Sequence, residues 1–295
     1  MEQEIQKNNQ LMKQASYASL TMAVSLIILK AIAFFITGSM AILSGLFDSV
    51  QDLMTSSVNM LAIRQATEPD DKHHRFGHGK AQAIGSLVQA CIIFMAGTFL
   101  MIEAIKRFLN PEPLERLGWG VVVTVIAVVA TLALVKFQTY VVHKTNSLSI
   151  HADKAHYTGD VMMNIGILLS MLATYYLNWL WVDSVFGIGV ALYLFVVVYQ
   201  VIHASCEMLM DTEMPEDFRK EIKSIAHSCA KVHLVHDLKT RRSGDRAFVQ
   251  FCVHLDGNLT LLQADEITDK MENQIRKRFP NTEVIIHPEP ERKNI

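Results

Sequence analysis

The sequence predicts an all-α bundle of six transmembrane helices over residues 1–210, followed by a C-terminal α+β domain over residues 211–295. Two observations favour this fold class. Hydrophobic residues make up 51% of the chain and charged residues only 19%, against about 25% in an ordinary soluble domain. Apolar stretches also recur through the first two thirds of the chain, whereas the composition changes to polar and charged after Met210.

Six stretches are candidates for membrane-spanning helices, because about 20 mostly apolar residues cross the hydrocarbon core of a bilayer. Four of them contain no charged residue: residues 81–102, 117–135, 161–181 and 184–202. The other two are interrupted, residues 16–37 by Lys30 and residues 40–63 by two aspartates. We expect the fifth helix to begin earlier than its apolar stretch, near Ser147.

The distribution of charge and cysteine predicts the surroundings of the chain. Lys and Arg are more numerous in the loops after the second and fourth spans than in the odd-numbered loops, which places both termini in the cytosol. The four cysteines form no CxxC pair and favour a reducing compartment over a disulfide framework. A net charge of −2 gives no indication of nucleic-acid binding. The polar N-terminus does not have the pattern of a removable signal peptide.

The C-terminal residues alternate in the pattern of a small sandwich. Helical spacing of Phe218, Ile222 and Ile225 follows Pro215, and residues 261–279 form a second amphipathic helix. Residues 233–240, 247–255 and 284–287 read as strands, the first two joined by a turn at 241–246. The order α-β-β-α-β is typical of a ferredoxin-like domain. About 80 residues give a small core, so we expect a homodimer.

Two pairs of polar residues stand inside the predicted spans. Asp48 and Asp52 lie four residues apart in the second span, and His156 and Asp160 lie four apart in the fifth. Residues at this spacing share a helix face. A carboxylate in a bilayer costs about 2.5–3.5 kcal/mol, which marks a functional site. We therefore predict a tetrahedral cage for a divalent cation.

The ligand types narrow the choice of ion and suggest how it is exchanged. Zinc accepts nitrogen and carboxylate oxygen, and Mn²⁺, Fe²⁺, Co²⁺ and Cd²⁺ also fit, whereas the absence of thiolate argues against Cu(I). Metal must displace protons from the same atoms, so metal and protons compete. The alternative is a purely structural polar network in which an aspartate pairs with Lys30.

Two further clusters combine metal-ligating side chains. The loop from Asp70 to His78 holds acids and three histidines within nine residues, which could bind a metal from solvent or form a hydrated polar loop. The C-terminal domain contains a third set, of which the histidines could equally be ordinary surface or core residues. Its members are His236, Cys252, His254, Asp265, His287 and Glu289.

The residues Gly45-Leu-Phe-Asp48-Ser-Val-Gln-Asp52, Arg75-Phe-Gly-His-Gly-Lys80 and His156-Tyr-Thr-Gly-Asp160 resemble the cation diffusion facilitator family over nearly the whole chain. The resemblance implies a homodimeric, proton-coupled exporter of divalent metal in a bacterial inner membrane. It implies zinc as the first cargo, with cadmium and iron as others, and zinc as a structural or regulatory ion. The implied ligands are Asp48, Asp52, His156 and Asp160 in the membrane, Asp71, His74 and His78 in the loop, and His236, Cys252, Asp265, His287 and Glu289 in the C-terminal domain.

The sequence departs from the family pattern in the implied ligand set of the C-terminal domain. Cys252 and Asp265 stand where histidine is usual, and Glu289 stands where aspartate is usual, which leaves the number of ions there open. A membrane-embedded metalloenzyme is disfavoured because the chain has no HExxH motif and protein fills all four predicted positions, so we predict that it is not an enzyme. A metal sensor or receptor that never transports remains an alternative.

Overall fold

A computed structural model describes residues 2–37, 40–110, 118–177, 179, 181–229 and 231–291. These residues form eight helices and three strands in two compact units. The helical unit is Lys7–Ser205, and the C-terminal unit is Cys206–Ile295 with Met1–Gln6. Leu117, where the fourth predicted span starts, and Asn178 and Leu180 in the fifth predicted span lie outside the described residues.

The described residues of the helical unit form long helices. Their bounds are α1 Glu2–Thr37, α2 Met40–Ala66, α3 Ala81–Leu109, α4 Gly118–Thr145, α5 Leu148–Leu177 and α6 Val182–Leu209. Among the described residues, stretches of four helices are long and apolar enough to cross a membrane: Gln6–Ile36, Ala81–Leu109, Thr124–Thr145 and Val182–Leu209. The other two, α2 and α5, have 27 and 30 residues. At about 1.5 Å per residue, both are longer than the hydrocarbon core is thick.

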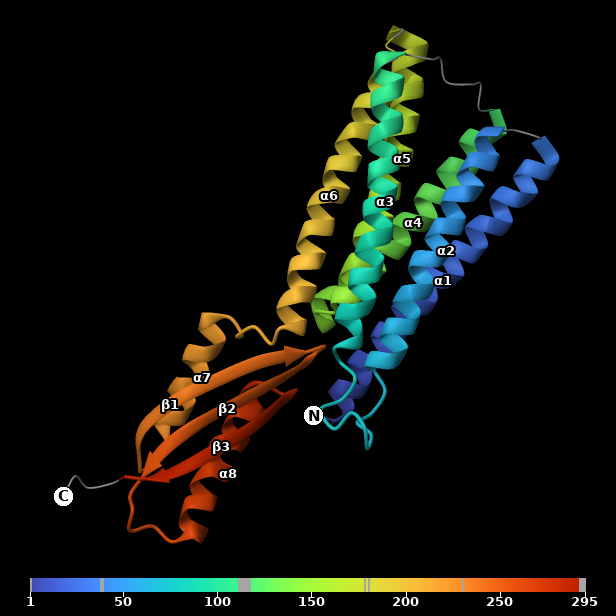
Figure 1. Cartoon of the computed structure of the whole chain (residues 1–295). Helices are drawn as coiled ribbons and strands as arrows, with labels where there is room; N and C mark the ends of the chain where they lie inside the picture. Colours follow the sequence, from blue (N-terminus) through green and yellow to red (C-terminus); the bar gives the residue numbers. More distant parts are fainter. Residues whose placement is uncertain are drawn as a thin grey trace. The chain divides into compact units, whose positions relative to one another are not determined.

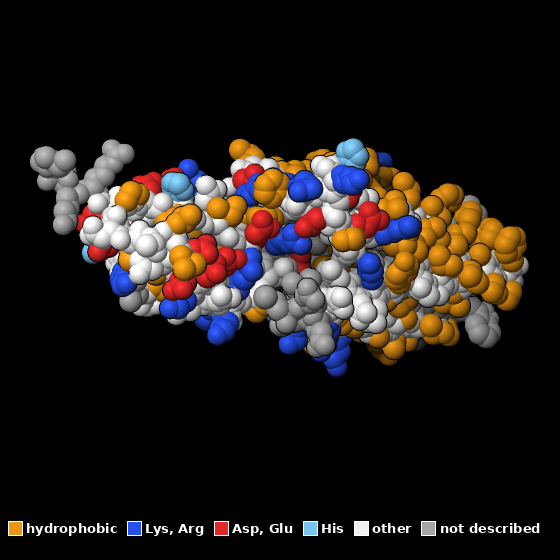
Figure 2. Space-filling view, turned by 90° about the horizontal axis from the view of Figure 1, so that it is seen from below, with side chains coloured by type: hydrophobic (Ala, Val, Ile, Leu, Met, Phe, Trp, Pro, Cys, Tyr) orange, Lys and Arg blue, Asp and Glu red, His pale blue; other side chains and the backbone are white. Residues whose placement is uncertain are grey.

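The helical unit buries many polar side chains beside its apolar core clusters and exposes large apolar side chains. Asp52, Gln89, Gln138, Asp153 and His156 are all buried, together with many serines and threonines. Large apolar side chains lie on the surface instead, and Figure 2 shows them crowded over one stretch of the molecule while charged side chains gather elsewhere. This arrangement is expected where the surrounding solvent is lipid.

Two groups of helices build the helical unit. Figure 1 shows α1, α2 and α4 diverging from α3, α5 and α6 toward the top of the view, while α4 packs against α5 and α2 packs against α3. Small residues allow close approach between neighbouring helices: a Cβ on Gly85 of α3 would overlap the Cβ of Ala62 on α2, and one on Gly159 of α5 would lie 2.9 Å from Leu194 on α6. The helices α2 and α5, which carry the predicted ligands, pack against each other.

A tight connection fixes the start of α5. Asn146 adopts a positive φ of 49°, a conformation that Asn tolerates better than most residues. The Ser147 hydroxyl then accepts a hydrogen bond from the backbone N–H of Ile150 at 3.4 Å and donates one to Gln82 Oε1 of α3 at 2.9 Å. The hydroxyl therefore caps α5 and ties its first turn to α3.

The C-terminal unit contains α7 Glu216–Ser228, β1 Val232–Ser243, β2 Arg246–Leu255, α8 Leu261–Arg278 and β3 Thr282–Pro290. The sheet order is β1-β2-β3, with β1 antiparallel and β3 parallel to β2. Both helices cover one face of the sheet (Figure 1), where Phe251, Val253, Met271 and Ile275 form the core. The opposite face of the sheet carries the alternate residues of each strand.

The hairpin between β1 and β2 is tighter than the sequence predicts. Residues 241–246 are expected to form a turn, but β1 continues to Ser243 and the turn is made by Gly244, with a φ of 64°, and Asp245. The strand continues because Arg241 pairs with Phe248 across the hairpin and places its guanidinium 4.8 Å from the centre of that ring.

Candidate metal centres

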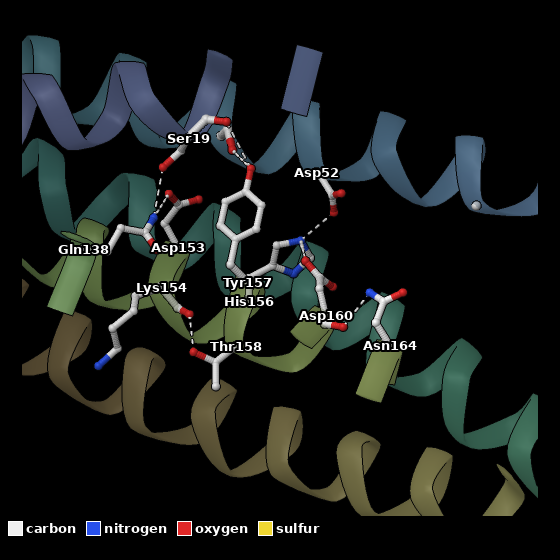
Figure 3. Close-up of polar contacts among 12 residues, drawn as sticks. Ser19, Asp52, Gln138, Asp153, Lys154, His156, Tyr157, Thr158, Asp160 and Asn164 are labelled. Atoms are coloured by element: carbon white, nitrogen blue, oxygen red, sulfur yellow. Dashed lines mark hydrogen bonds and ion pairs between the residues drawn. The ribbon is translucent and has the colours of Figure 1, made fainter. Parts of the chain in front are cut away.

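The first candidate centre lies between α2 and α5. Asp52 comes from α2, and His156 and Asp160 stand one turn apart on α5, so that the three side chains point toward one another (Figure 3). Asp52 Oδ1 lies 3.0 Å from His156 Nε2, and Asp160 Oδ2 lies 3.6 Å from the same nitrogen. His156 and Asp52 are only 4% and 6% exposed, so this is a buried cluster of opposite potential charges.

The spacing of these atoms suits a tetrahedral cation. Zinc binds nitrogen and carboxylate oxygen at about 2.0–2.2 Å, which separates two tetrahedral donors by about 3.4 Å. The distances from His156 Nε2 to Asp52 Oδ1, 3.0 Å, and to Asp160 Oδ2, 3.6 Å, lie on either side of that value. Asp160 Oδ2 is buried and has no hydrogen-bond donor among the described residues, so its lone pairs are available to a cation.

Asp48, the fourth predicted ligand, is not among the donor atoms that converge. It lies one turn before Asp52 on α2, nearer to Gly45, whose carbonyl accepts a hydrogen bond from Lys30 Nζ of α1 at 2.8 Å. The Lys30 ammonium acts electrostatically on both Asp48 and Asp160. The predicted four-ligand cage is therefore a three-donor cluster here, with Asp48 and a lysine at its edge.

A second polar network lies one turn along α5 from the cluster. Asp153 is fully buried, and its Oδ2 accepts hydrogen bonds from Asn59 Nδ2 of α2 at 3.1 Å and Gln138 Nε2 of α4 at 2.8 Å. Tyr157 lies between this network and His156 in Figure 3 and donates to the Ser19 carbonyl of α1 at 3.1 Å. In this conformation the network joins α1, α2, α4 and α5.

The second candidate centre lies in the loop between α2 and α3. Asp71 Oδ1 is 3.3 Å from His74 Nδ1, and Asp71 Oδ2 is 3.4 Å from His78 Nε2. Gly77, at a φ of 78°, turns the chain so that the two histidines face the same carboxylate. Hydrogen bonds from the backbone N–H groups of His74 and then His73 hold the pKa of Asp71 below its usual value, which keeps the carboxylate ionised. The His73 ring is outside this group.

The third candidate centre lies on the face of the C-terminal sheet that the helices leave uncovered. His236, Cys252 and Glu289 each place one donor atom within 4.8 Å of the other two. His287, on the same strand as Glu289, has its Nε2 3.8 Å from Glu289 Oε1 and is 66% exposed. Asp265 lies exposed on α8, which covers the other face of the sheet, so a single chain does not bring it to this group.

The Cys252 thiol is protonated in this arrangement. Burial first, and then the Glu289 and Asp237 carboxylates, raise the pKa of Cys252 above its ordinary value. A metal that uses this sulfur must therefore displace a proton.

His254 is the functional candidate that the family pattern misses. Its Nε2 lies 3.0 Å from His236 Nε2 and 3.2 Å from Glu289 Oε2, nearer to that oxygen than His236 Nε2 is, at 3.6 Å. His254 is not one of the three residues whose donor atoms all lie within 4.8 Å of one another. The strand alternation that places Cys252 and His254 on one face is the signal that identifies it.

Comparison with known proteins agrees with this architecture. Residues 16–210 match the family model of the cation efflux transmembrane domain, and residues 214–291 match that of the cation efflux protein cytoplasmic domain. The chain belongs to the cation efflux family. The cation-efflux pump FieF of Klebsiella pneumoniae is 39% identical over 285 residues, which cover 97% of this chain and 95% of the relative. The FieF pump of Escherichia fergusonii is 37% identical over the same shares.

One solved structure is similar to part of the chain. The metal-bound C-terminal domain of the CzcD transporter from Thermotoga maritima is 28% identical and covers 28% of this chain and 100% of that domain, with a TM-score of 0.25.

Membership of the cation efflux family confirms the predicted resemblance to the cation diffusion facilitators. The protein is a multi-pass membrane transporter of metal cations with a cytoplasmic domain, and it is not an enzyme.

Proposed function

We propose that this protein is a proton-coupled antiporter that exports divalent metal cations from the cytosol, zinc foremost and cadmium and ferrous iron as further cargo. One observation carries the proposal: Asp52, His156 and Asp160 converge inside helices whose outer surface is apolar. Two carboxylates and an imidazole, buried in a lipid-facing bundle, form a cation site where a transport path must run.

Cargo binding would use these three donors and Asp48. A divalent ion that approaches from the edge of the cluster meets Asp48 one turn away on the same face of α2. A side-chain rotation at Asp48 would supply the fourth oxygen of a tetrahedron.

Proton coupling follows from the chemistry of the donors. Zinc requires a neutral imidazole and ionised carboxylates, so each binding event releases protons from His156 or its neighbours. When the cargo leaves, protons return to the same atoms and relieve the repulsion between Asp52 and Asp160. Metal and protons thus occupy the cluster in turn.

The two helix groups offer a way to change access. Asp52 belongs to the group of α1, α2 and α4, whereas His156 and Asp160 belong to the group of α3, α5 and α6. Relative movement of the groups would open the cluster to one side of the membrane and then to the other.

The remaining parts complete the proposed transporter. All six helices span a bacterial inner membrane with both termini in the cytosol, and the domain boundary lies after residue 210. Residues 211–295 form a ferredoxin-like domain that dimerises and holds regulatory or structural zinc. Leu234 and Ile285 are 48% and 51% exposed on the uncovered sheet face, which supports a partner there. In the Asp71 loop, zinc would bind from the solvent.

Transport in sealed vesicles tests the proposal. The purified chain is reconstituted into liposomes with a pH-sensitive dye and a zinc-sensitive dye inside, and zinc is added outside. An antiporter carries zinc inward and protons outward together. Zinc binding to the protein without either flux would instead identify a metal sensor or receptor and overturn the transport proposal.

A further inference from the structure

A lysine stands inside the membrane-spanning part of α1. Lys30 is the only charged residue in the sequence between Lys13 and Asp48. Ile28 and Ile32, two residues to either side of it, are 54% and 55% exposed on the apolar outer surface. Because residues two apart on an α-helix project about 200° apart, Lys30 points away from that surface and into the bundle, where it is half-buried. A charged side chain at such a position marks a function.

The Lys30 side chain lies against α2 at Gly45. Its Nζ donates a hydrogen bond to the Gly45 carbonyl at 2.8 Å. The end of the side chain follows the same surface, since a Cβ added to Gly45 would lie 3.6 Å from Nζ and 3.8 Å from Cδ, which is ordinary van der Waals contact. An ammonium has three N–H donors, and this carbonyl uses one of them. The charge is therefore anchored to α2.

This anchor places the positive charge beside the candidate cargo site. Gly45, Asp48 and Asp52 are three and four residues apart, so they lie along one face of α2. Lys30 is thus held about one helical turn from Asp48. Its ammonium acts electrostatically on Asp48 and also on Asp160 of α5. Lys30 therefore influences carboxylates on both of the helices that form the site.

The charges of these side chains match a divalent ion. The three carboxylates of Asp48, Asp52 and Asp160 carry three negative charges when ionised, and the Lys30 ammonium offsets one of them. A divalent cation beside a neutral imidazole then makes the site electrically neutral, which a low-dielectric interior favours. Asp153 is left out of this count, because two amide groups donate to it in the second network.

We propose that Lys30 is a resident counter-ion of the cargo site, which sets the charge of the site to suit a divalent cation and weakens its hold on the ion. The inference rests on the proposed function, because a lower affinity is useful where the ion must leave again in every transport cycle. Like charges repel, so the ammonium lowers the affinity for cargo and speeds its release.

A purely structural lysine would have the opposite signature. If Lys30 only fixed α1 to α2 through the Gly45 carbonyl, its removal would loosen the site and weaken metal binding. If it acts as a counter-ion, its removal leaves an excess negative charge and strengthens metal binding. The direction of the change in zinc affinity therefore separates the two roles.

Equilibrium zinc binding to the full-length chain in detergent micelles measures this direction. Every sample carries Asp71→Ala and Cys252→Ala, which remove a donor from each of the other two clusters. A chelator sets the free zinc at alkaline pH, where few protons compete for the donors. Lys30→Met keeps the length of the side chain and removes its charge, and it should bind zinc at least about tenfold more tightly. Lys30→Arg keeps the charge and should bind as the parent chain does.

Two further comparisons assign the effect to the charge of Lys30. Lys136→Met removes an exposed lysine of α4 and should leave the zinc affinity unchanged. In a background of Asp48→Asn, adding Lys30→Met should again strengthen binding relative to Asp48→Asn alone. This second pair removes one charge of each sign, so it provides the comparison even if Lys30→Met by itself does not fold.

Zinc flux in sealed vesicles is the second measurement, and Lys30→Met should transport zinc more slowly although it binds zinc more tightly. If the folded Lys30→Met chain binds zinc as the parent chain does, or more weakly, Lys30 is a structural residue only and the proposal is overturned. Binding by Lys30→Arg as tight as that of Lys30→Met would also overturn it, because charge would not be the cause. Absence of flux in the wild type would instead overturn the proposed function and leave the binding comparison valid.

Discussion

The two units of this protein differ in the side chains that they expose and in how many charged and polar side chains they bury. In the helical unit Asp52, Asp153 and His156 are inside, while Phe99 and other large apolar residues are outside. In the C-terminal unit Phe251 is fully buried, and the predicted metal ligands His236 and Glu289 lie half-exposed on the sheet. Burial of a given residue type therefore affects stability differently in each unit, because lipid surrounds the helical unit and water surrounds the C-terminal unit.

The contrast between the two units is largest for charged side chains. When one partner of a buried carboxylate–imidazole pair is removed, water cannot take its place and the remaining charge is left uncompensated. A carboxylate in an exposed loop is solvated by water when its partner is removed. The largest effects of substitution should consequently fall on the helical unit, and the exposed clusters should tolerate change.

The largest expected effect is that of Asp52→Ala. Removing one partner of a buried charged pair destabilises a protein by about 3–5 kcal/mol, equivalent to about 10²–10⁴-fold in an equilibrium constant, and here it also removes a proposed ligand. Zinc flux into vesicles should fall to background while the chain remains folded by circular dichroism. Asp71→Ala, in the exposed loop, is the control and should change flux far less. Flux near the wild-type level in Asp52→Ala would remove the buried cluster from the transport path.

Substitution of two phenylalanines, one in each unit, tests this difference in burial directly. Phe251→Ala in the C-terminal core should lower the free energy of unfolding by about 3–5 kcal/mol. Phe99→Ala on α3, where the side chain is 72% exposed, should change it by no more than about 0.5 kcal/mol. Denaturant titration in detergent, followed by circular dichroism, measures both. Equal effects would show that the apolar surface of α3 is packed against protein.

Two glycines compare packed and open positions within the helical unit. Gly85→Ala would drive a methyl group into Ala62 of α2 and should destabilise the unit by about 1–3 kcal/mol. Gly189→Ala on α6 meets nothing within 4 Å and should be neutral or slightly stabilising. Thermal unfolding in detergent should give a lower midpoint for the first variant alone, and a matching loss in the second would disprove the packing difference.

The smallest expected effect is a change of metal preference. His156→Asp replaces a nitrogen donor by an oxygen donor, which should shift the preference from zinc toward Mn²⁺ by about tenfold, or about 1.4 kcal/mol. Competition between the two ions in the vesicle assay measures this ratio. An unchanged ratio would mean that His156 does not select the ion.

Helix periodicity predicts much of the site. Four-residue spacing places His156 and Asp160 on one face, and the expected start of α5 near Ser147 agrees with the observed start at Leu148. The sequence could not predict which aspartate of α2 meets His156. That choice depends on how α2 and α5 are aligned in depth, which contacts between the two helices decide, such as the hydrogen bond from Asn59 Nδ2 to Asp153 Oδ2.

In the C-terminal unit, too, local sequence patterns predict part of the arrangement and tertiary contacts determine the rest. Alternation predicts that Cys252 and His254 share a face, but the pairing of His254 with Glu289 depends on the parallel register of β2 and β3. The extension of β1 to Ser243 is likewise set by a contact across the hairpin, Arg241 with Phe248, which no local pattern contains.

The most direct test of the central claim is to locate the cargo itself. Crystals of the zinc-loaded protein, measured on both sides of the zinc absorption edge, give an anomalous map. The account predicts a peak about 2.0–2.2 Å from His156 Nε2 and from one oxygen each of Asp52 and Asp160. Zinc peaks at the Asp71 loop and at His236, with none between α2 and α5, would contradict it.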